Sequence, residues 1–247
     1  DILSRHVPSF PHTETVDGVS VWYLDEGSTL VHIPGALDEA LRSALFNELA
    51  PGPDCPIRWE QHHIRTPRGD RVPLPRKTAL LSDGQGAATS YEYSGITNLV
   101  QPMPESVKSL AQFINDIRGG TYNVAFANWY ANGRTSHIGW HADAESMIDQ
   151  ECGIASISLG ETGLFQILHK GEQKRLGATK AAKRVKIEAG RLVELYLCAG
   201  DLLFMLGKDF QSNWIHRVPK DKQRILARLN LTFRLLHCIC LHMHICI

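Results

Sequence analysis

The stretch Arg228-Leu-Asn-Leu-Thr-Phe-Arg234 decides the fold, because polar and apolar residues alternate along its whole length. A period of two predicts a β-strand with the arginines and the asparagine on one face and the leucines and the phenylalanine on the other. Arginines on an inward face are costly to bury unless an anion meets them. Arg228 and Arg234 lie roughly 20 Å apart along such a strand, but their long side chains can bend toward a small dianion between them. Arginine pairs well with carboxylates, so a dicarboxylate suits this face, and a solvated strand face is the alternative.

Several short segments after residue 123 have the same β-like character, and turn signals separate most of them. The turn signals include Asn132-Gly133, residues 160–163 and Ala199-Gly-Asp201. The predicted strands cover residues 123–130, 154–160, 163–169, 191–198, 201–206, 214–218 and 227–235. Short strands in this number predict a β-sandwich or jelly-roll core.

Two helices are predicted before these strands. Leucines recur every four residues from Leu37 to Leu49, and Pro51-Gly-Pro53 ends this helix. Pro104 opens the second helix and Gly119-Gly120 stops it. Its expected apolar stripe consists of Val107, Leu110, Phe113, Ile114 and Ile117. Residues 19–24 are β-like, whereas the Pro-, Gly- and Arg-rich residues 54–100 predict hairpins and loops rather than core. We therefore expect an α+β chain with helices packed on one side.

The composition is that of an ordinary globular protein. The 247 residues are 43% hydrophobic and 21% charged, and 26 basic residues balance 26 acidic ones. This balance excludes a disordered chain, a collagen-like repeat and a histone-like binder. No apolar run approaches the roughly 20 residues of a membrane helix, and no signal segment is visible. The six cysteines form no CxxC pair, so we expect reduced intracellular thiols. The Cys- and His-rich tail 237–247 matches no zinc template, and its function is left open.

A metal site is predicted at His141-Ala-Asp143. Residues i and i+2 of an extended segment point the same way, so the imidazole and the carboxylate can meet one ion. His216, 75 residues downstream in the predicted strand, is the best third ligand. Two histidines and one carboxylate form the facial triad of non-haem Fe(II) oxygenases. The triad leaves three positions open, which a 2-oxo acid and dioxygen can fill. For either histidine alone, a hydrogen-bonded strand residue is the commoner explanation.

Five segments taken in order resemble the AlkB family of Fe(II)/2-oxoglutarate-dependent nucleic-acid dealkylases, and are most similar to the DNA-repair homologues of animal nuclei. They are Asn128-Trp-Tyr130, His141-Ala-Asp143, Ile154-Ala-Ser-Ile-Ser-Leu-Gly160, His216 and Arg228-Leu-Asn-Leu-Thr-Phe-Arg234. Val72-Pro-Leu-Pro-Arg-Lys77 and Tyr91-Glu-Tyr-Ser-Gly95 also match the nucleotide-recognition region of that family. The resemblance covers about residues 70–235. No internal repeat or linker is visible, so a single domain is expected over residues 1–236. Its double-stranded β-helix (jelly-roll) core lies at 123–236, and its helices and nucleotide-recognition lid lie at 1–122.

The resemblance implies a role for each matching position. The implied Fe(II) ligands are His141, Asp143 and His216. The implied 2-oxoglutarate ligands are Arg228, Asn230 and Tyr130 at the distal carboxylate, with Asn128 and Arg234 nearer the metal. In the recognition region, Tyr91 and Tyr93 are the implied substrate-binding residues. Tyr93 would stack on a flipped base, and Glu145 would approach the edge of that base. Strand packing is the alternative for the tyrosines, and a solvated turn acid for Glu145. The implied reaction consumes O2 and 2-oxoglutarate, forms succinate and CO2, and removes N-alkyl groups such as those of 1-methyladenine or 3-methylcytosine as an aldehyde.

The net charge of zero for the whole chain conceals a strongly basic segment. Residues 170–186 contain seven basic residues and one acid, a net of +6, so the remaining 19 basic and 25 acidic residues give −6. Its glycines predict a loop. By the resemblance this loop grips phosphates, with Lys183 and Arg184 as contacts, and a solvated loop is the alternative. A second basic edge is expected from Arg65, Arg68, Arg71, Arg76 and Lys77, and Trp59 is the candidate for a wedge that fills the gap left by a flipped base.

DNA dealkylation is the leading hypothesis for the function. RNA demethylation or protein hydroxylation by the same iron chemistry is the second, and a non-catalytic barrel that binds nucleic acid is the third. The intact triad and both arginines argue against the third. We expect a monomer with a nucleic-acid partner, DNA before RNA, and no membrane partner. The resemblance implies an intracellular and nuclear location.

Overall fold

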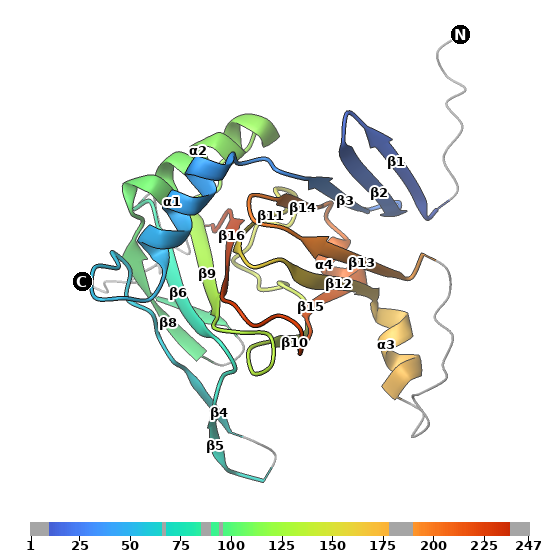
Figure 1. Ribbon diagram of the computed structural model, residues 1–247. Coiled ribbons are helices and arrows are strands. Elements are labelled where there is room, and N and C mark those ends of the chain that lie inside the picture. The colour runs from blue at the N-terminus through green and yellow to red at the C-terminus, as the bar shows by residue number, and fades with distance from the viewer. Residues whose placement is uncertain (1–9, 66–67, 85–89, 94–95, 178–189, 238–247) are drawn as a thin grey trace, which may run out of the picture.

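Two β-sheets facing each other form the body of the protein, and two helices lie along one side of the larger sheet (Figure 1). The structure, a computed structural model, describes residues 10–65, 68–84, 90–93, 96–177 and 190–237. The ten strands of the large sheet are, in spatial order, β1 (His12–Val16), β2 (Val19–Asp25), β3 (Ser28–Ile33), β14 (Leu202–Leu206), β11 (Ile154–Gly160), β16 (Arg228–Arg234), β9 (Val124–Tyr130), β6 (Lys77–Ser82), β8 (Ile96–Pro102) and β7 (Ser90–Tyr93). The four strands of the small sheet are β10 (Ile138–His141), β15 (Trp214–Val218), β12 (Gly163–His169) and β13 (Leu192–Leu197).

All seven strands predicted after residue 123 are present within a residue of their predicted bounds, and the predicted jelly-roll core is confirmed. Strand β16 lies near the middle of the large sheet, antiparallel to β11 on one side and to β9 on the other. Its apolar residues Leu229, Leu231 and Phe233 pack in the core beneath the helices. The alternate residues, from Arg228 to Arg234, are buried between the two sheets. The period of two therefore assigned both faces of this strand correctly.

Helix α1 (Glu39–Leu49) begins where the Asp38 side chain accepts a hydrogen bond from the backbone N–H of Leu41, a standard N-terminal cap. Leu45 and Leu49 are buried against the sheet, but Leu41 is 46% exposed. The four leucines thus do not form one buried stripe.

Helix α2 (Glu105–Arg118) follows Pro104 as predicted and ends at Gly119, whose left-handed conformation (φ 68°) closes the last turn. Val107, Leu110 and Ile114 are buried, as expected. Phe113 and Ile117 are 38% and 46% exposed, so their assignment to the apolar stripe was wrong. The spacing of the apolar residues identified the helix correctly. The buried face of the helix, however, includes Ala111 and not Phe113 or Ile117.

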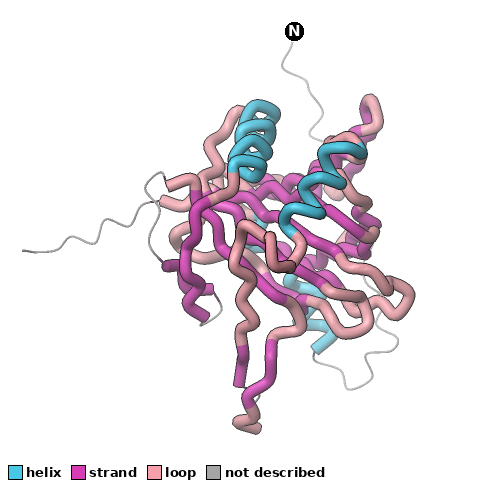
Figure 2. Tube along the Cα trace, turned by 60° about the vertical axis from the view of Figure 1, so that its left-hand side comes forward, coloured by secondary structure: helices cyan, strands magenta, loops and turns pink. Residues whose placement is uncertain are grey.

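Residues 54–100 contribute more to the core than predicted. Strand β6 pairs antiparallel with β9 and parallel with β8, and Ala79, Leu80 and Leu81 are buried. The expectation that this region lies outside the core was wrong for β6, because the sheet covers both of its edges. Strands β4 (His63–Arg65) and β5 (Arg71–Pro73) form the expected hairpin, which extends away from both sheets (Figure 2).

The predictions for the basic segment 170–186, the tail 237–247 and Trp59 can be compared with the structure as well. Residues 170–177 form helix α3 (Lys170–Gly177) rather than a loop, and Lys183 and Arg184 lie outside the described residues, as does most of the tail, 238–247. Trp59 is no wedge, because its Nε1 donates to the carbonyl of Leu49 and its ring packs 6.2 Å from that of Trp129. A short helix, α4 (Phe210–Asn213), precedes β15. Among the described residues, no helix is both long and apolar enough to cross a membrane.

Candidate active site

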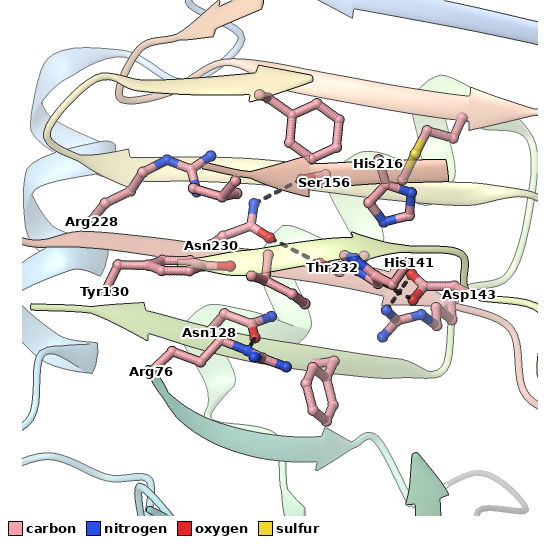
Figure 3. Close-up of a pocket in the computed structure, with 16 residues that line it drawn as sticks. Arg76, Asn128, Tyr130, His141, Asp143, Ser156, His216, Arg228, Asn230 and Thr232 are labelled. Carbon is pink, nitrogen blue, oxygen red and sulfur yellow. Dashed lines mark hydrogen bonds and ion pairs between the residues drawn. The ribbon is translucent and has the colours of Figure 1, made fainter. Parts of the chain in front are cut away.

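Strands β10 and β15 bring the three predicted metal ligands together. His141 ends β10 and lies opposite His216 on β15, and Asp143 follows His141 by two residues. One ligand atom from each of the three residues lies within 4.8 Å of the other two, and the imidazole centroids are 4.2 Å apart. The pairing of β10 with β15 is short and contains a register shift. This short pairing nevertheless sets both imidazoles at one end of the space between the sheets (Figure 3).

The protonation states of the cluster suit a divalent cation. Burial raises the pKa of Asp143, but the Arg234 guanidinium and the two imidazoles outweigh it and hold that pKa well below its usual range. Burial lowers the pKa of His216 to about 3 and also lowers that of His141. At neutral pH the site therefore holds one carboxylate and two neutral imidazoles, the forms in which these side chains bind metals.

The hydrogen bonds of His141 and Asp143 fix which of their atoms can face a metal ion. The Nδ1 of His141 lies 2.9 Å from the carbonyl of Gly139, so we assign it as the donor, which leaves Nε2 as a lone-pair ligand. Arg234 Nη2 donates to Asp143 Oδ2 over 2.6 Å. The other carboxylate oxygen, Oδ1, is buried, has no hydrogen-bond partner among the described residues, and lies 4.0 Å from His141 Nε2. A cation between these atoms would satisfy both, so the residues fit Fe(II).

Two glutamines hold the Asp143 backbone. The side-chain oxygen of Gln211, on α4, accepts the Asp143 N–H over 2.9 Å, and Gln150 Nε2 donates to the Asp143 carbonyl over 3.2 Å. Gln211 is buried. Sequence reasoning missed both residues, because nothing in their local pattern indicates which backbone they meet.

Arg228 forms the other end of the cavity. Its side chain is 1% exposed, and its Nη2 donates to Ser158 Oγ over 2.8 Å. Its Nε and Nη1 are buried and have no partner among the described residues. A buried guanidinium with two unused donors is costly unless an anion binds there, and a carboxylate matches its geometry. The Tyr130 ring lies 5.8 Å from this guanidinium and points into the cavity (Figure 3).

Polar side chains between the two ends are hydrogen-bonded to one another. Asn230 Nδ2 donates to Ser156 Oγ (2.7 Å) and to a β11 carbonyl (2.9 Å), and its Oδ1 accepts from Thr232 Oγ1 (2.9 Å). Asn128 Oδ1 accepts from Arg76 Nε over 2.8 Å. The amide of Asn230 thus braces β16 against β11 while one side of the residue faces the cavity.

The predicted residues divide into those that line the cavity and those that do not. The lining includes Arg76, Asn128, Tyr130, His141, Asp143, His216, Arg228, Asn230 and Arg234. Lys77 is exposed and Glu145 is half-buried, and neither lines the cavity. The backbones of Tyr91 and Tyr93 lie in β7, and their side chains are outside the described set.

Some lining residues were missed although the sequence carried a signal for them. Ser156 and Ser158 alternate within an otherwise apolar strand, which marks one polar face of β11. Phe126 shares a face with Asn128 and Tyr130 by the same period, and Arg234 stacks over its ring at 5.5 Å.

Two neutral histidines and one carboxylate lie at one end of the cavity, and a buried arginine that can bind a carboxylate lies at the other end. Inside a jelly-roll core, this arrangement is that of a non-haem Fe(II) oxygenase that uses a 2-oxo dicarboxylate. The family model described as 2OG-Fe(II) oxygenase superfamily matches residues 29–234. The chain belongs to this superfamily, so its predicted cofactor set of Fe(II), 2-oxoglutarate and O2 is confirmed.

Relatives with AlkB names agree with the predicted resemblance. The chain is 30% identical to the human DNA oxidative demethylase ALKBH2 over 161 residues, which cover 65% of this chain and 56% of that protein. It is 34% identical to the Bos taurus alpha-ketoglutarate-dependent dioxygenase alkB homolog 3 over 206 residues, 81% of this chain and 64% of that protein. It is 30% identical to the Arabidopsis thaliana DNA oxidative demethylase ALKBH2 over 232 residues, 91% and 70% of the two chains. The chain thus spans less than two thirds of the first two relatives.

Proposed function

We propose that this protein is a dioxygenase that removes N-alkyl groups of the 1-methyladenine and 3-methylcytosine type from DNA. One observation carries the oxidative chemistry. A single cavity contains the His141, Asp143 and His216 cluster at one end, and at the other end two donors of Arg228 that have no partner in the described part of the chain. The names of the relatives, which include DNA oxidative demethylase, support DNA as the substrate.

The reaction combines the substrate with one O2 and one 2-oxoglutarate. One oxygen atom ends in succinate as CO2 leaves, and the other becomes the hydroxyl of an N–CH2OH group. That group loses formaldehyde, and the proton on its oxygen passes to the base nitrogen. Fe(II), when bound, supplies the activation of dioxygen for this chemistry. The protein holds the dicarboxylate through Arg228 and Tyr130, keeps the two imidazoles neutral, and encloses the reacting groups within buried walls.

The β4–β5 hairpin supports a polyanionic partner. Arg65 lies directly opposite Arg71 in its register, and both side chains are exposed, as is Arg68 near the tip. Like charges directly opposite each other on a hairpin repel. A phosphate bound near the pair would relieve this repulsion. We include a flipped base in the proposal, because a base inside a duplex must leave the stack before its N-alkyl carbon can reach the metal.

The decisive experiment is demethylation followed by mass spectrometry. The protein, Fe(II) and 2-oxoglutarate are incubated with DNA or RNA, single- or double-stranded, carrying 1-methyladenine or 3-methylcytosine. We expect loss of the methyl group from DNA and no turnover by His141→Ala. Turnover on RNA alone would replace DNA by RNA as the substrate. Absence of turnover on every nucleic acid would refute the proposal.

The proposed phosphate contacts can be tested separately by measuring DNA affinity and its dependence on salt. We expect Arg65→Gln with Arg71→Gln to weaken DNA binding and to reduce its salt dependence, and Lys183→Ala with Arg184→Ala to act in the same way. Lys108, whose half-exposed side chain pairs with Glu105 on α2, provides the control, because Lys108→Gln should leave DNA affinity unchanged. If one of these double variants binds DNA with the affinity of the wild type, the segment that carries its two substitutions is not part of the proposed DNA interface.

We also propose that the protein is a monomer, and that it is nuclear, as the AlkB resemblance implies. Sedimentation equilibrium should give a mass near the 27.6 kDa of one chain. A fluorescent fusion expressed in animal cells should accumulate in the nucleus. A stable dimer or a purely cytoplasmic signal would contradict the corresponding part.

A further inference from the structure

A second buried arginine lies behind the dicarboxylate end of the cavity. Arg224 belongs to the segment between β15 and β16, and its side chain is almost completely buried, with 3% exposed. Among the described residues, its guanidinium donates to two carbonyl oxygens, that of Leu226 at 3.3 Å and that of Ser136 at 3.5 Å. Among the described residues, no carboxylate lies within 4.0 Å of it. Arg224 does not line the cavity, so it can act on a ligand through the position of a neighbour and through its charge, but not by direct contact.

That neighbour is Tyr130. Its ring centroid lies 5.9 Å from the guanidinium carbon of Arg224 and 5.8 Å from that of Arg228. The phenol thus contacts two cations and is fully enclosed. Cations near an aromatic ring restrict its orientation. Two arginines together therefore fix the direction in which the Tyr130 hydroxyl points into the cavity.

Two glycines lie directly against the buried arginines. A Cβ added to Gly133 would lie 2.8 Å from the Arg224 Cβ and 3.1 Å from its Nε. A Cβ added to Gly163 would lie 2.9 Å from the Arg228 Cδ. Two glycines thus permit the close packing of both arginines beside Tyr130.

The charge around Arg224 is only partly balanced. Burial lowers its pKa, and the half-buried carboxylates of Glu161 and Asp221, together with Tyr130, oppose that effect. The Glu161 side chain is engaged elsewhere, since it accepts the backbone N–H of Leu226 over 2.6 Å. Buried positive charge therefore remains at this end of the cavity, and a ligand carboxylate would stabilise it.

We propose that Arg224 is a positioning residue that makes the site selective for a dianionic 2-oxo acid over a monoanionic one. It orients Tyr130 toward the distal carboxylate and adds a second positive charge behind Arg228. The proposal rests on the superfamily assignment and on no assumption about the nucleic-acid substrate.

Calorimetric titration of the Mn(II)-loaded protein tests this inference without turnover. The probes are 2-oxoglutarate and 2-oxopentanoate, which has the same chain length but lacks the distal carboxylate. We expect Arg224→Met to raise the Kd of 2-oxoglutarate about five- to twentyfold, from a charge on the order of 10 Å away at an effective dielectric constant of about 20 to 40. The Kd of 2-oxopentanoate should change less than about twofold.

Two further variants separate positioning from general damage. Arg224→Lys keeps the charge but loses the planar group, so its Kd for 2-oxoglutarate should lie between those of the wild type and Arg224→Met. Lys222→Met removes an exposed cation from the same segment and should bind both probes like the wild type. In turnover assays Arg224→Met should raise the KM for 2-oxoglutarate and leave kcat within about twofold.

Equal weakening of both probes, or a 2-oxoglutarate Kd within twofold of the wild type in Arg224→Met, would overturn the inference. Wild-type protein that does not bind 2-oxoglutarate would overturn it together with the superfamily chemistry. If the protein binds 2-oxoglutarate but does not demethylate DNA, the proposal that DNA is the substrate fails and the inference about Arg224 stands.

Discussion

Acidification should destabilise the metal-free protein through His216 by about 2 kcal/mol between pH 7 and pH 5. His216 is 4% exposed, and its burial lowers its pKa from 6.5 to about 3. In the unfolded chain the same imidazole is hydrated and titrates near its ordinary value. As the pH falls below 6.5, the unfolded state therefore binds a proton that the folded state does not, and stability declines until about pH 3.

The magnitude follows from the separation of the two pKa values. Each pH unit below 6.5 costs about 1.4 kcal/mol, so pH 5 costs about 2 kcal/mol and the loss approaches about 5 kcal/mol near pH 3. Other groups titrate over the same range. The prediction therefore concerns the difference between the wild type and a variant without this imidazole.

Urea unfolding at pH 7 and pH 5, after removal of metal with EDTA, measures that difference. His216→Asn replaces the imidazole by a group that does not titrate, so its loss between the two pH values should be about 2 kcal/mol smaller than that of the wild type. His63→Gln is the matched control, because it removes an imidazole that is exposed on β4 and does not line the cavity. Equal losses in the wild type and in His216→Asn would refute the reasoning.

Three further outcomes follow from the same geometry. Arg234→Met should lower the free energy of unfolding by about 3 to 5 kcal/mol in urea titrations, because it leaves the buried Asp143 carboxylate without its charged partner. Gly163→Ala should weaken 2-oxoglutarate binding severalfold in calorimetry, since its Cβ would lie 2.9 Å from the Arg228 Cδ. Arg217→Met should cost about 0.5 to 2 kcal/mol of stability and weaken Mn(II) binding, because its guanidinium lies 4.2 Å from a tryptophan ring on β10 and ties that strand to β15.

The strands of the core could be predicted because each carries its own signal. Strand β16 alternates without interruption, and β11 and β12 are apolar runs bounded by glycines. Strand β6 has a buried run of only a few residues among Pro, Gly and Arg, so its central place depends on the strands that flank it. Its burial is a property of the sheet and not of the local sequence.

The site was predictable to the extent that its residues lie on one strand or match a motif. The arginines of β16 face inward as expected, but the period could not show that Arg234 meets Asp143 while two donors of Arg228 have no partner among the described residues. That division depends on how β10 and its following turn pack across from β16. Gln211 and Arg224 were missed for the same reason, since their partners come from distant segments.

The charge within the cavity links the metal site to the dicarboxylate site. Among the described residues, three guanidinium groups line the cavity, those of Arg76, Arg228 and Arg234, against one carboxylate, that of Asp143, and the histidines are neutral. This leaves an excess of two positive charges before any cation enters. A divalent cation alone would increase the excess, whereas a dianion such as 2-oxoglutarate offsets it. The two ligands therefore favour each other's binding, and Arg234 contributes to both sites by holding Asp143 ionised while it supplies part of the positive charge that attracts the dianion.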